Sequence, residues 1–174
     1  MPGILRVDQA NVDYIYAKTA GGKVYVPGHV VQVVHSVLTT VFSTTSTSMT
    51  STGLTAVITP TTTSSKILAK VSGIGSAADA NASQILFQLV RSGTIVDGQS
   101  AIPWNTSIRA FATVEGARSR WPVTCNLLDS PSTTSSLTYT LNMMVTGSTG
   151  YLGRWGTDGN WNVATTLTLM EIAQ

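Results

Sequence analysis

The residue types that carry most enzyme chemistry are few in this chain and far apart. Its eight carboxylates are dispersed, and no pair has a spacing that suggests a general acid and a general base. The motif G-x-S-x-G is absent, and no Cys-His or Ser-His-Asp set is indicated. The one cysteine, Cys125, lies in an apolar, strand-like stretch, where a buried small residue is a better interpretation than a reactive thiol. The sequence therefore predicts that the protein is not an enzyme.

Two patterns resemble ligand sites but lack the context that such sites need. Gly73-Ile74-Gly75-Ser76-Ala77-Ala78 fits the dinucleotide-binding pattern G-x-G-x-x-A. That pattern requires a following helix, and the next strand is expected from Gln84, which leaves too little chain for one. His29 and His35 are six residues apart and are expected on one face of a strand, with no acidic or thiol ligand nearby. We expect no cofactor and no metal, although one histidine from each of three copies could converge at a three-fold axis.

Aromatic residues are the strongest site candidates. Tyr151, Trp155 and Trp161 cluster in a glycine-punctuated loop between two predicted strands, and Trp104 lies at another strand end. Aromatic rings beside Asp and Asn suit stacking on sugars and hydrogen bonding to their hydroxyl groups. Subunit contacts, in which Trp is a common anchor, and packing under the loop remain alternatives. A glycan or receptor site would comprise Trp104, Tyr151, Trp155, Asp158, Asn160 and Trp161.

Composition favours a β-rich fold and argues against several functional classes. Charged residues are 10% of the chain, against about 25% in typical soluble domains, and Ser and Thr make up about a quarter of it. Threonine favours strands, whereas Glu and Lys, which are common on helix surfaces, are scarce. The net charge is +2 with no basic stripe, so we expect no nucleic-acid binding. No apolar run suits a membrane span and no signal peptide is evident, so we expect no membrane insertion.

After Gly28, apolar strand candidates alternate with turns rich in Ser, Thr, Gly, Pro, Asn and Asp. In the clearest candidate, Leu137, Tyr139 and Leu141 alternate with polar residues. The Ser/Thr tract from Thr39 to Thr52 is expected to form an exposed strand and loop. About eight strands at a spacing of roughly 8–12 residues predict an all-β, jelly-roll-like antiparallel β-sandwich over residues 29–174. The expected strands are 30–38, 53–59, 66–71, 84–91, 108–115, 123–128, 137–145 and 163–172.

Residues 1–28 differ from the rest and are predicted to form an extended N-terminal arm. Two short apolar alternations, Ile4 to Val7 and Val12 to Tyr16, are followed by breakers at Gly21-Gly22 and Pro27-Gly28. A strand of this length cannot bury its apolar face alone. We expect the arm to dock onto a partner; an edge strand of the same domain is the alternative. The docking residues would be Ile4, Leu5, Val7, Val12, Tyr14 and Tyr16.

Several short motifs follow one another in a distinctive order. They are Ile4-Leu5-Arg6-Val7-Asp8 with Ala20-Gly21-Gly22-Lys23, Pro27-Gly28-His29-Val30-Val31-Gln32-Val33-Val34, Thr52-Gly53-Leu54-Thr55-Ala56-Val57-Ile58-Thr59-Pro60, Ser64-Ser65-Lys66-Ile67-Leu68 and Thr166-Leu167-Thr168-Leu169-Met170-Glu171-Ile172. In their order and spacing the chain resembles virion appendage proteins (short tail fibres, head fibres or decoration proteins) of phages that infect aquatic bacteria, including cyanobacteria. The resemblance spans nearly the whole chain and is weakest from about Ser92 to Pro131.

This resemblance implies a protein of the phage particle surface, made in the host cytoplasm, that forms a β-sandwich homotrimer attached through its N-terminal arm. We expect a short tail-fibre or baseplate-attached appendage that binds the host. Its partners would be other copies of itself, other virion proteins and host surface polysaccharide. A capsid decoration or head-fibre protein is the alternative. A monomeric carbohydrate-binding module unrelated to a virus is a third hypothesis, but it leaves the arm unexplained.

Overall fold

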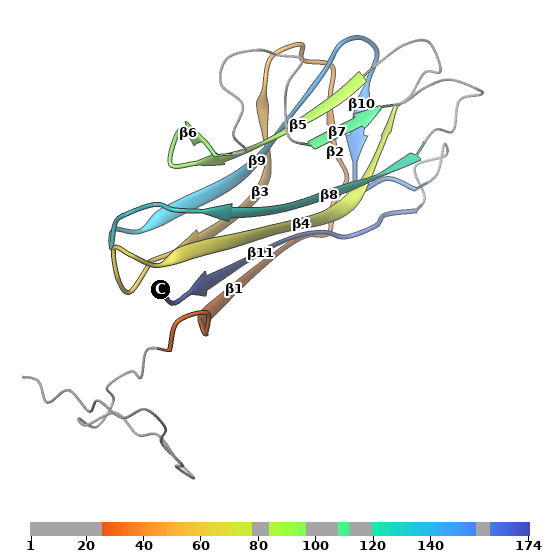
Figure 1. Ribbon diagram of the computed structural model, residues 1–174. Helices are drawn as coiled ribbons and strands as arrows, with labels where there is room; N and C mark the ends of the chain where they lie inside the picture. The colour runs from red at the N-terminus through yellow and green to blue at the C-terminus, as the bar shows by residue number, and fades with distance from the viewer. Residues whose placement is uncertain (1–25, 78–83, 97–107, 112–119, 156–160) are drawn as a thin grey trace, which may run out of the picture.

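The structure, a computed structural model, describes residues 26–77, 84–96, 108–111, 120–155 and 161–174, with the backbone alone for 108–111. Within these ranges the chain forms strands and no helix, and the strands build two antiparallel sheets that face each other (Figure 1). The predicted all-β sandwich is therefore confirmed. The strands are β1 Val30–Leu38, β2 Phe42–Thr44, β3 Thr50–Ile58, β4 Lys66–Ala77, β5 Gln84–Arg91, β6 Thr94–Ile95, β7 Ile108–Phe111, β8 Arg120–Asp129, β9 Leu137–Val145, β10 Gly150–Leu152 and β11 Thr165–Ile172.

The strand order is that of a jelly roll. In sheet A, β1 pairs with β11, β11 with β4, and β4 with β8, while β10 pairs with both β4 and β2. In sheet B, β3 pairs with β9, β9 with β5, and β5 with β7 and β6. Most of these neighbours are far apart in the sequence, as two interlocked Greek keys require. The connections between the sheets consequently gather at the two ends of the sandwich.

The core lies between the two sheets and follows the alternation of side chains along each strand. In β9, Leu137, Tyr139 and Leu141 are buried, whereas the residues between them are partly exposed. Cys125 is buried in β8, as expected. The inner faces of both sheets contribute the large core side chains, which include Leu54, Ile58, Ile67, Phe87, Leu89, Tyr139, Leu141, Met143, Leu152, Leu167 and Leu169.

The structure departs from the expected strands chiefly in β4, which is twice as long as predicted and includes the G-x-G pattern. Gly75 lies on the inner face, where a Cβ would meet the side chains of Val123 and Phe87 at 3.3 and 3.4 Å. The glycine therefore serves close sheet packing within a strand, and Gly73 to Ala77 form no phosphate-binding turn. The short strands β2 and β10 were not predicted, because their Ser-, Thr- and Gly-rich sequences are also typical of turns.

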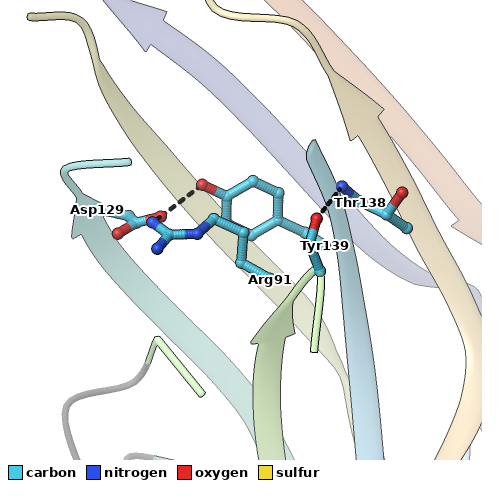
Figure 2. Close-up of polar contacts among 5 residues, drawn as sticks. Arg91, Asp129, Thr138 and Tyr139 are labelled. Carbon is cyan, nitrogen blue, oxygen red and sulfur yellow. Dashed lines mark hydrogen bonds and ion pairs between the residues drawn. The ribbon is translucent and has the colours of Figure 1, made fainter. Parts of the chain in front are cut away.

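A partly buried polar contact joins the two sheets near one end of the sandwich. Arg91 in β5 and Tyr139 in β9 belong to sheet B, and both donate hydrogen bonds to Oδ2 of Asp129 in β8 of sheet A, at 2.5 and 2.6 Å (Figure 2). Burial, together with the hydrogen bond to Asp129, raises the pKa of the Tyr139 phenol well above its usual range. Asp129 thus accepts hydrogen bonds from two residues of the opposite sheet.

A fully buried carboxylate, Glu171, stabilises the same end. Glu171 in β11 has no exposed surface. It accepts hydrogen bonds from Gln32 Nε2 at 2.6 Å, from the Thr61 backbone N–H at 2.7 Å, and from the hydroxyl groups of Thr61 and Ser65. Burial by itself raises the pKa of Glu171, but these hydrogen bonds outweigh burial and lower the pKa to about 2. The network joins β11 to β1 and to the connection between β3 and β4.

Candidate ligand-binding site

The candidate site arises where two neighbouring strands of sheet A are interrupted at the same level. Along β4, β10 pairs as far as Leu152 opposite Gly75, and β11 resumes with Thr166 opposite Ser72. The neighbouring edge of the sheet, formed by β1 and β2, is interrupted at the same level. Leu38 of β1 lies opposite Thr165, and Phe42 of β2 lies opposite Leu152. The chain therefore leaves the sheet after Leu152 and returns to it at Thr165, between two strand segments that run in the same direction.

Gly153 makes this departure possible. Its φ of +79° lies in the left-handed region, and a Cβ would come within 2.8 Å of the Val163 carbonyl oxygen. Its own N–H donates a hydrogen bond to the Ile74 carbonyl at 2.8 Å, which holds the departing chain against β4. A side chain at this position would disturb both the turn and the returning strand.

Residues 153–155 and 161–163 pair in an antiparallel manner, and we call these two paired segments, which carry two tryptophans, the tryptophan hairpin. Val163 N–H donates to Gly153 O, and Trp155 N–H donates to Trp161 O, each at 2.8 Å, on either side of the bridge between Arg154 and Asn162. Trp155 and Trp161 are thus directly opposite each other, and directly opposite residues of an antiparallel pair point to the same side. Their exposed fractions are 47% and 65%, so the hairpin displays aromatic surface to solvent.

Two arginines lie over aromatic rings in this region, one over Trp155 and one over Tyr151. Across the sheet, Tyr151 lies opposite Ser76, and Ser76 lies opposite Arg120. The Arg120 guanidinium lies over the Trp155 ring, 5.0 Å from its centroid, and that of Arg154 lies over the Tyr151 ring at 4.1 Å. We call these two arginines, together with Tyr151, Trp155 and Trp161, the aromatic–arginine cluster.

The structure brings together part of the predicted glycan site. Tyr151, Trp155 and Trp161 belong to one cluster, whereas Asp158, Asn160 and Trp104 lie outside the described residues. Arg120 was not predicted as a site residue. No local pattern could have indicated it, because only the pairing of β8 with β4 places Arg120 beside the hairpin.

The predicted docking residues all lie in the segment 1–25, outside the described part of the chain: Ile4, Leu5, Val7, Val12, Tyr14 and Tyr16. The structure corrects the expectation that His29 and His35 share one face of a strand. His29 precedes β1, and a register irregularity between Val30 and Gln32 breaks the alternation. His35 instead interacts with the Thr168 hydroxyl at 2.8 Å.

The outer face of sheet A carries a second feature, which we call the apolar row. Val33, Met170, Leu68 and Leu128 lie opposite one another on β1, β11, β4 and β8. Val33 and Leu128 have exposed fractions of 56% and 53%. An exposed row of apolar side chains across a whole sheet is typical of a surface that contacts another protein.

Charge is unevenly distributed over the described residues. Both carboxylates whose side chains are described, Asp129 and Glu171, are held in the polar networks at the far end of the sandwich. No group of three or more His, Cys, Asp or Glu residues with metal-binding potential occurs in the described ranges. No helix there is long and apolar enough to cross a membrane. Of the four described cations of this region, Lys66 lies at that same end of β4 with Lys70 four residues further along the strand, whereas Arg120 and Arg154 lie near the tryptophan hairpin.

Fold and site together define a jelly-roll β-sandwich with an exposed aromatic–arginine cluster. No protein-family profile matches the chain, and no curated protein sequence is significantly similar to it. A solved structure of a mutant VP2 protein of infectious bursal disease virus, from derived T=1 particles, aligns with a TM-score of 0.41 and 10% identity over 82% of this chain and 36% of that chain. A VP2 subviral particle of the same virus gives a TM-score of 0.36 and 12% identity over 83% and 38%. The chain therefore spans little more than a third of either VP2 protein, and TM-scores this low establish no shared function.

Proposed function

We propose that the chain is a surface protein of a phage particle, a homotrimeric short tail-fibre or baseplate-attached appendage that binds host polysaccharide. The aromatic–arginine cluster would make the host contact, and the N-terminal arm would attach the protein to the virion. Two observations support the class: the sequence motifs that resemble phage appendage proteins, and a jelly-roll fold, which occurs in viral and lectin domains. Because one fold serves many functions, the proposal depends on the geometry of the site.

The main support for the proposal is that the start of the described chain and the tryptophan hairpin lie at opposite ends of the sandwich. The described chain starts beside the C-terminus, where Gly28 N–H donates to Ala173 O and Ala173 N–H donates to His29 O, each within 2.9 Å (Figure 1). The tryptophan hairpin precedes the opposite end of β11, and the eight residues of this strand span roughly 25 Å. An arm anchored at one end would leave the cluster free to reach outward at the other.

The cluster has the surface that a sugar-binding site needs. Exposed indole rings pack against the apolar C–H faces of pyranose rings, and adjacent guanidinium groups donate hydrogen bonds to hydroxyl oxygens. The hairpin backbone is held to β4 by the Gly153 hydrogen bond, so part of the ordering cost of binding is met before the ligand arrives.

Trp155→Ala and Trp161→Ala test this site. Each variant should bind host-envelope polysaccharide about tenfold more weakly, because each loses one stacking face worth about 1.4 kcal/mol. Binding is measured by titration of purified protein with extracted polysaccharide. Val57→Ala is the matched control, since Val57 is equally exposed but lies on β3 of the other sheet. Unchanged binding in both tryptophan variants would contradict a polysaccharide site at the hairpin.

A capsid decoration or head-fibre protein is the second candidate, and the apolar row favours it. That row offers a contact surface for another protein on the outer face of sheet A. Quantitative mass spectrometry of purified particles separates the two candidates by the ratio of this chain to the major capsid protein. Tens of copies per particle support the tail appendage, whereas hundreds support the capsid role.

A further inference from the structure

We infer that the tryptophan hairpin recognises a linear polysaccharide along its chain, with consecutive sugar residues on Trp155 and Trp161, rather than a single sugar at a chain end. This inference rests on the proposed function and specifies the form of its ligand. It depends on three properties of the described residues: the spacing of the two tryptophans, the ring surface that each keeps accessible, and the position of Trp161 on an open surface.

The first property is the spacing of the two tryptophans. Trp155 N–H donates to Trp161 O at 2.8 Å, next to the bridge between Arg154 and Asn162, so the two tryptophans form a hydrogen-bonded position of the hairpin. The Cα atoms at such a position are about 5.5 Å apart. A sugar held between two rings would need about 7 Å, because each van der Waals contact takes about 3.5 Å. The backbone thus sets the rings too close to enclose one sugar, at a spacing that matches the length of one pyranose residue in an extended chain.

The second property is the surface that each ring keeps accessible. The Arg120 guanidinium lies over the Trp155 ring, 5.0 Å from its centroid, so one face of this ring is occupied by a side chain. Trp155 nevertheless keeps an exposed fraction of 47%, and Trp161 is more exposed still. Two rings that covered each other would both lose this surface. Each tryptophan therefore offers a ring surface of its own to one sugar, and the two surfaces are adjacent.

The third property is the position of Trp161 on an open surface. Recognition of one terminal sugar typically uses a concave pocket, because enclosure distinguishes the last sugar of a chain from those before it. Trp161 instead lies on an excursion from sheet A and has an exposed fraction of 65%, which is typical of an open surface. Such a surface accepts the side of a sugar anywhere along a chain.

The two rings act together only on a chain of linked sugars. A single sugar contacts one ring, and this contact must offset the whole loss of translational and rotational freedom on binding. A second sugar linked to the first reaches the neighbouring ring after that loss has been met, so its contact adds directly to affinity. The stacking contact expected of each ring, about tenfold in affinity, should therefore appear as a gain with chain length.

The test uses the full chain and the extracted host-envelope polysaccharide, intact and hydrolysed into fragments of defined length. Fragments of up to about four sugars are too short to join two copies of the hairpin, so they report on one site. The unaltered chain should bind the longer of these fragments about tenfold more tightly than the single sugar. Trp155→Ala and Trp161→Ala should each remove most of this gain but change affinity for the single sugar only about twofold, because the other ring remains. Titration of the intact polymer should give several bound copies per polymer chain, and their number should rise with polymer length.

Val57→Ala is the matched control, since Val57 is exposed on β3 of the other sheet, and this variant should keep the full gain with length. Thermal melting confirms that each variant is folded, and the number of copies of the unaltered chain on the polymer tests the inference independently of any variant. Equal affinity for the single sugar and the longer fragments, or one bound copy per polymer chain at every length, would overturn recognition along the chain while the proposed polysaccharide site stands. Failure of the unaltered chain to bind the polymer or any fragment would overturn both.

Discussion

At the residue scale, Glu171 is a buried group whose ionisation affects folding. Four hydrogen-bond donors surround its carboxylate, and all four favour the charged form. The unfolded chain takes up a proton at this residue near pH 4.5, but the folded chain does so only near pH 2. Between these values the unfolded state holds more protons, so acidification favours unfolding.

We therefore expect the stability contributed by Glu171 to be fully present above about pH 5 and lost by about pH 2, a change of about 3 kcal/mol. Glu171→Gln should lower the free energy of unfolding at pH 7 by about 2–3 kcal/mol, because its amide N–H₂ group faces donors where oxygen is needed. Urea denaturation at pH 7 and pH 3 measures both effects. Thr63→Ala, an exposed change in the same connection, is the control. Equal destabilisation by Glu171→Gln at both pH values would contradict this account.

At the scale of elements, the tryptophan hairpin is an excursion from a strand of the sheet. Its position depends on the simultaneous interruption of two neighbouring strands of sheet A, between Leu152 and Thr165 and between Leu38 and Phe42. A flexible loop at the end of the sandwich would impose no such orientation on its side chains. The cluster therefore depends on a correctly formed junction at Gly153.

Gly153→Ala should lower the free energy of unfolding by more than the strain of a positive φ alone would, because the added Cβ also meets a backbone carbonyl. Gly93 has a similar φ of +87°, but a Cβ there would meet nothing within 4 Å, so Gly93→Ala is a matched control for backbone strain. We expect Gly93→Ala to cost about 1 kcal/mol of stability and Gly153→Ala a further 1–2 kcal/mol, because of the contact with the Val163 carbonyl. Denaturant titration measures this difference, and polysaccharide binding should fall in the Gly153 variant alone. Equal losses in the two variants would show that the carbonyl contact is unimportant.

At the scale of the whole molecule, the proposed attachment and binding functions lie at opposite ends of β11 and should be separable. Deleting residues 1–25 should leave the melting temperature nearly unchanged, because the strands described here begin at Val30 and the core lies within the sandwich. The truncated chain should still bind polysaccharide but should not be incorporated into particles.

Trp155→Ala provides the complementary control, because it retains the arm. It should be incorporated into particles at the normal copy number and bind host polysaccharide weakly. Copy number is measured by mass spectrometry of purified particles, and binding by adsorption to host cells. Incorporation of the arm-deleted chain at the normal level would contradict attachment through the arm.

The sequence by itself determined the all-β character of the chain and the positions of most long strands, including β1, β5 and β9. Alternation and turn chemistry act over a few residues, so they can be read without knowledge of the fold. The length of β4 was harder to predict from the sequence, because glycine typically marks a turn, whereas Gly75 lies within the strand and allows close packing of the sheets. The aromatic half of the cluster was predictable for the same local reason, since Tyr151, Trp155 and Trp161 lie within eleven residues.

Only the tertiary structure decided which strands became neighbours. Pairing of β8 with β4 brings Arg120 over Trp155, and pairing across four strands aligns the apolar row from Val33 to Leu128. Both arrangements depend on register, and a shift of one residue would turn every side chain of a strand to the other face. Register is selected by the packing of two complete sheets against one core, which no local stretch of sequence contains.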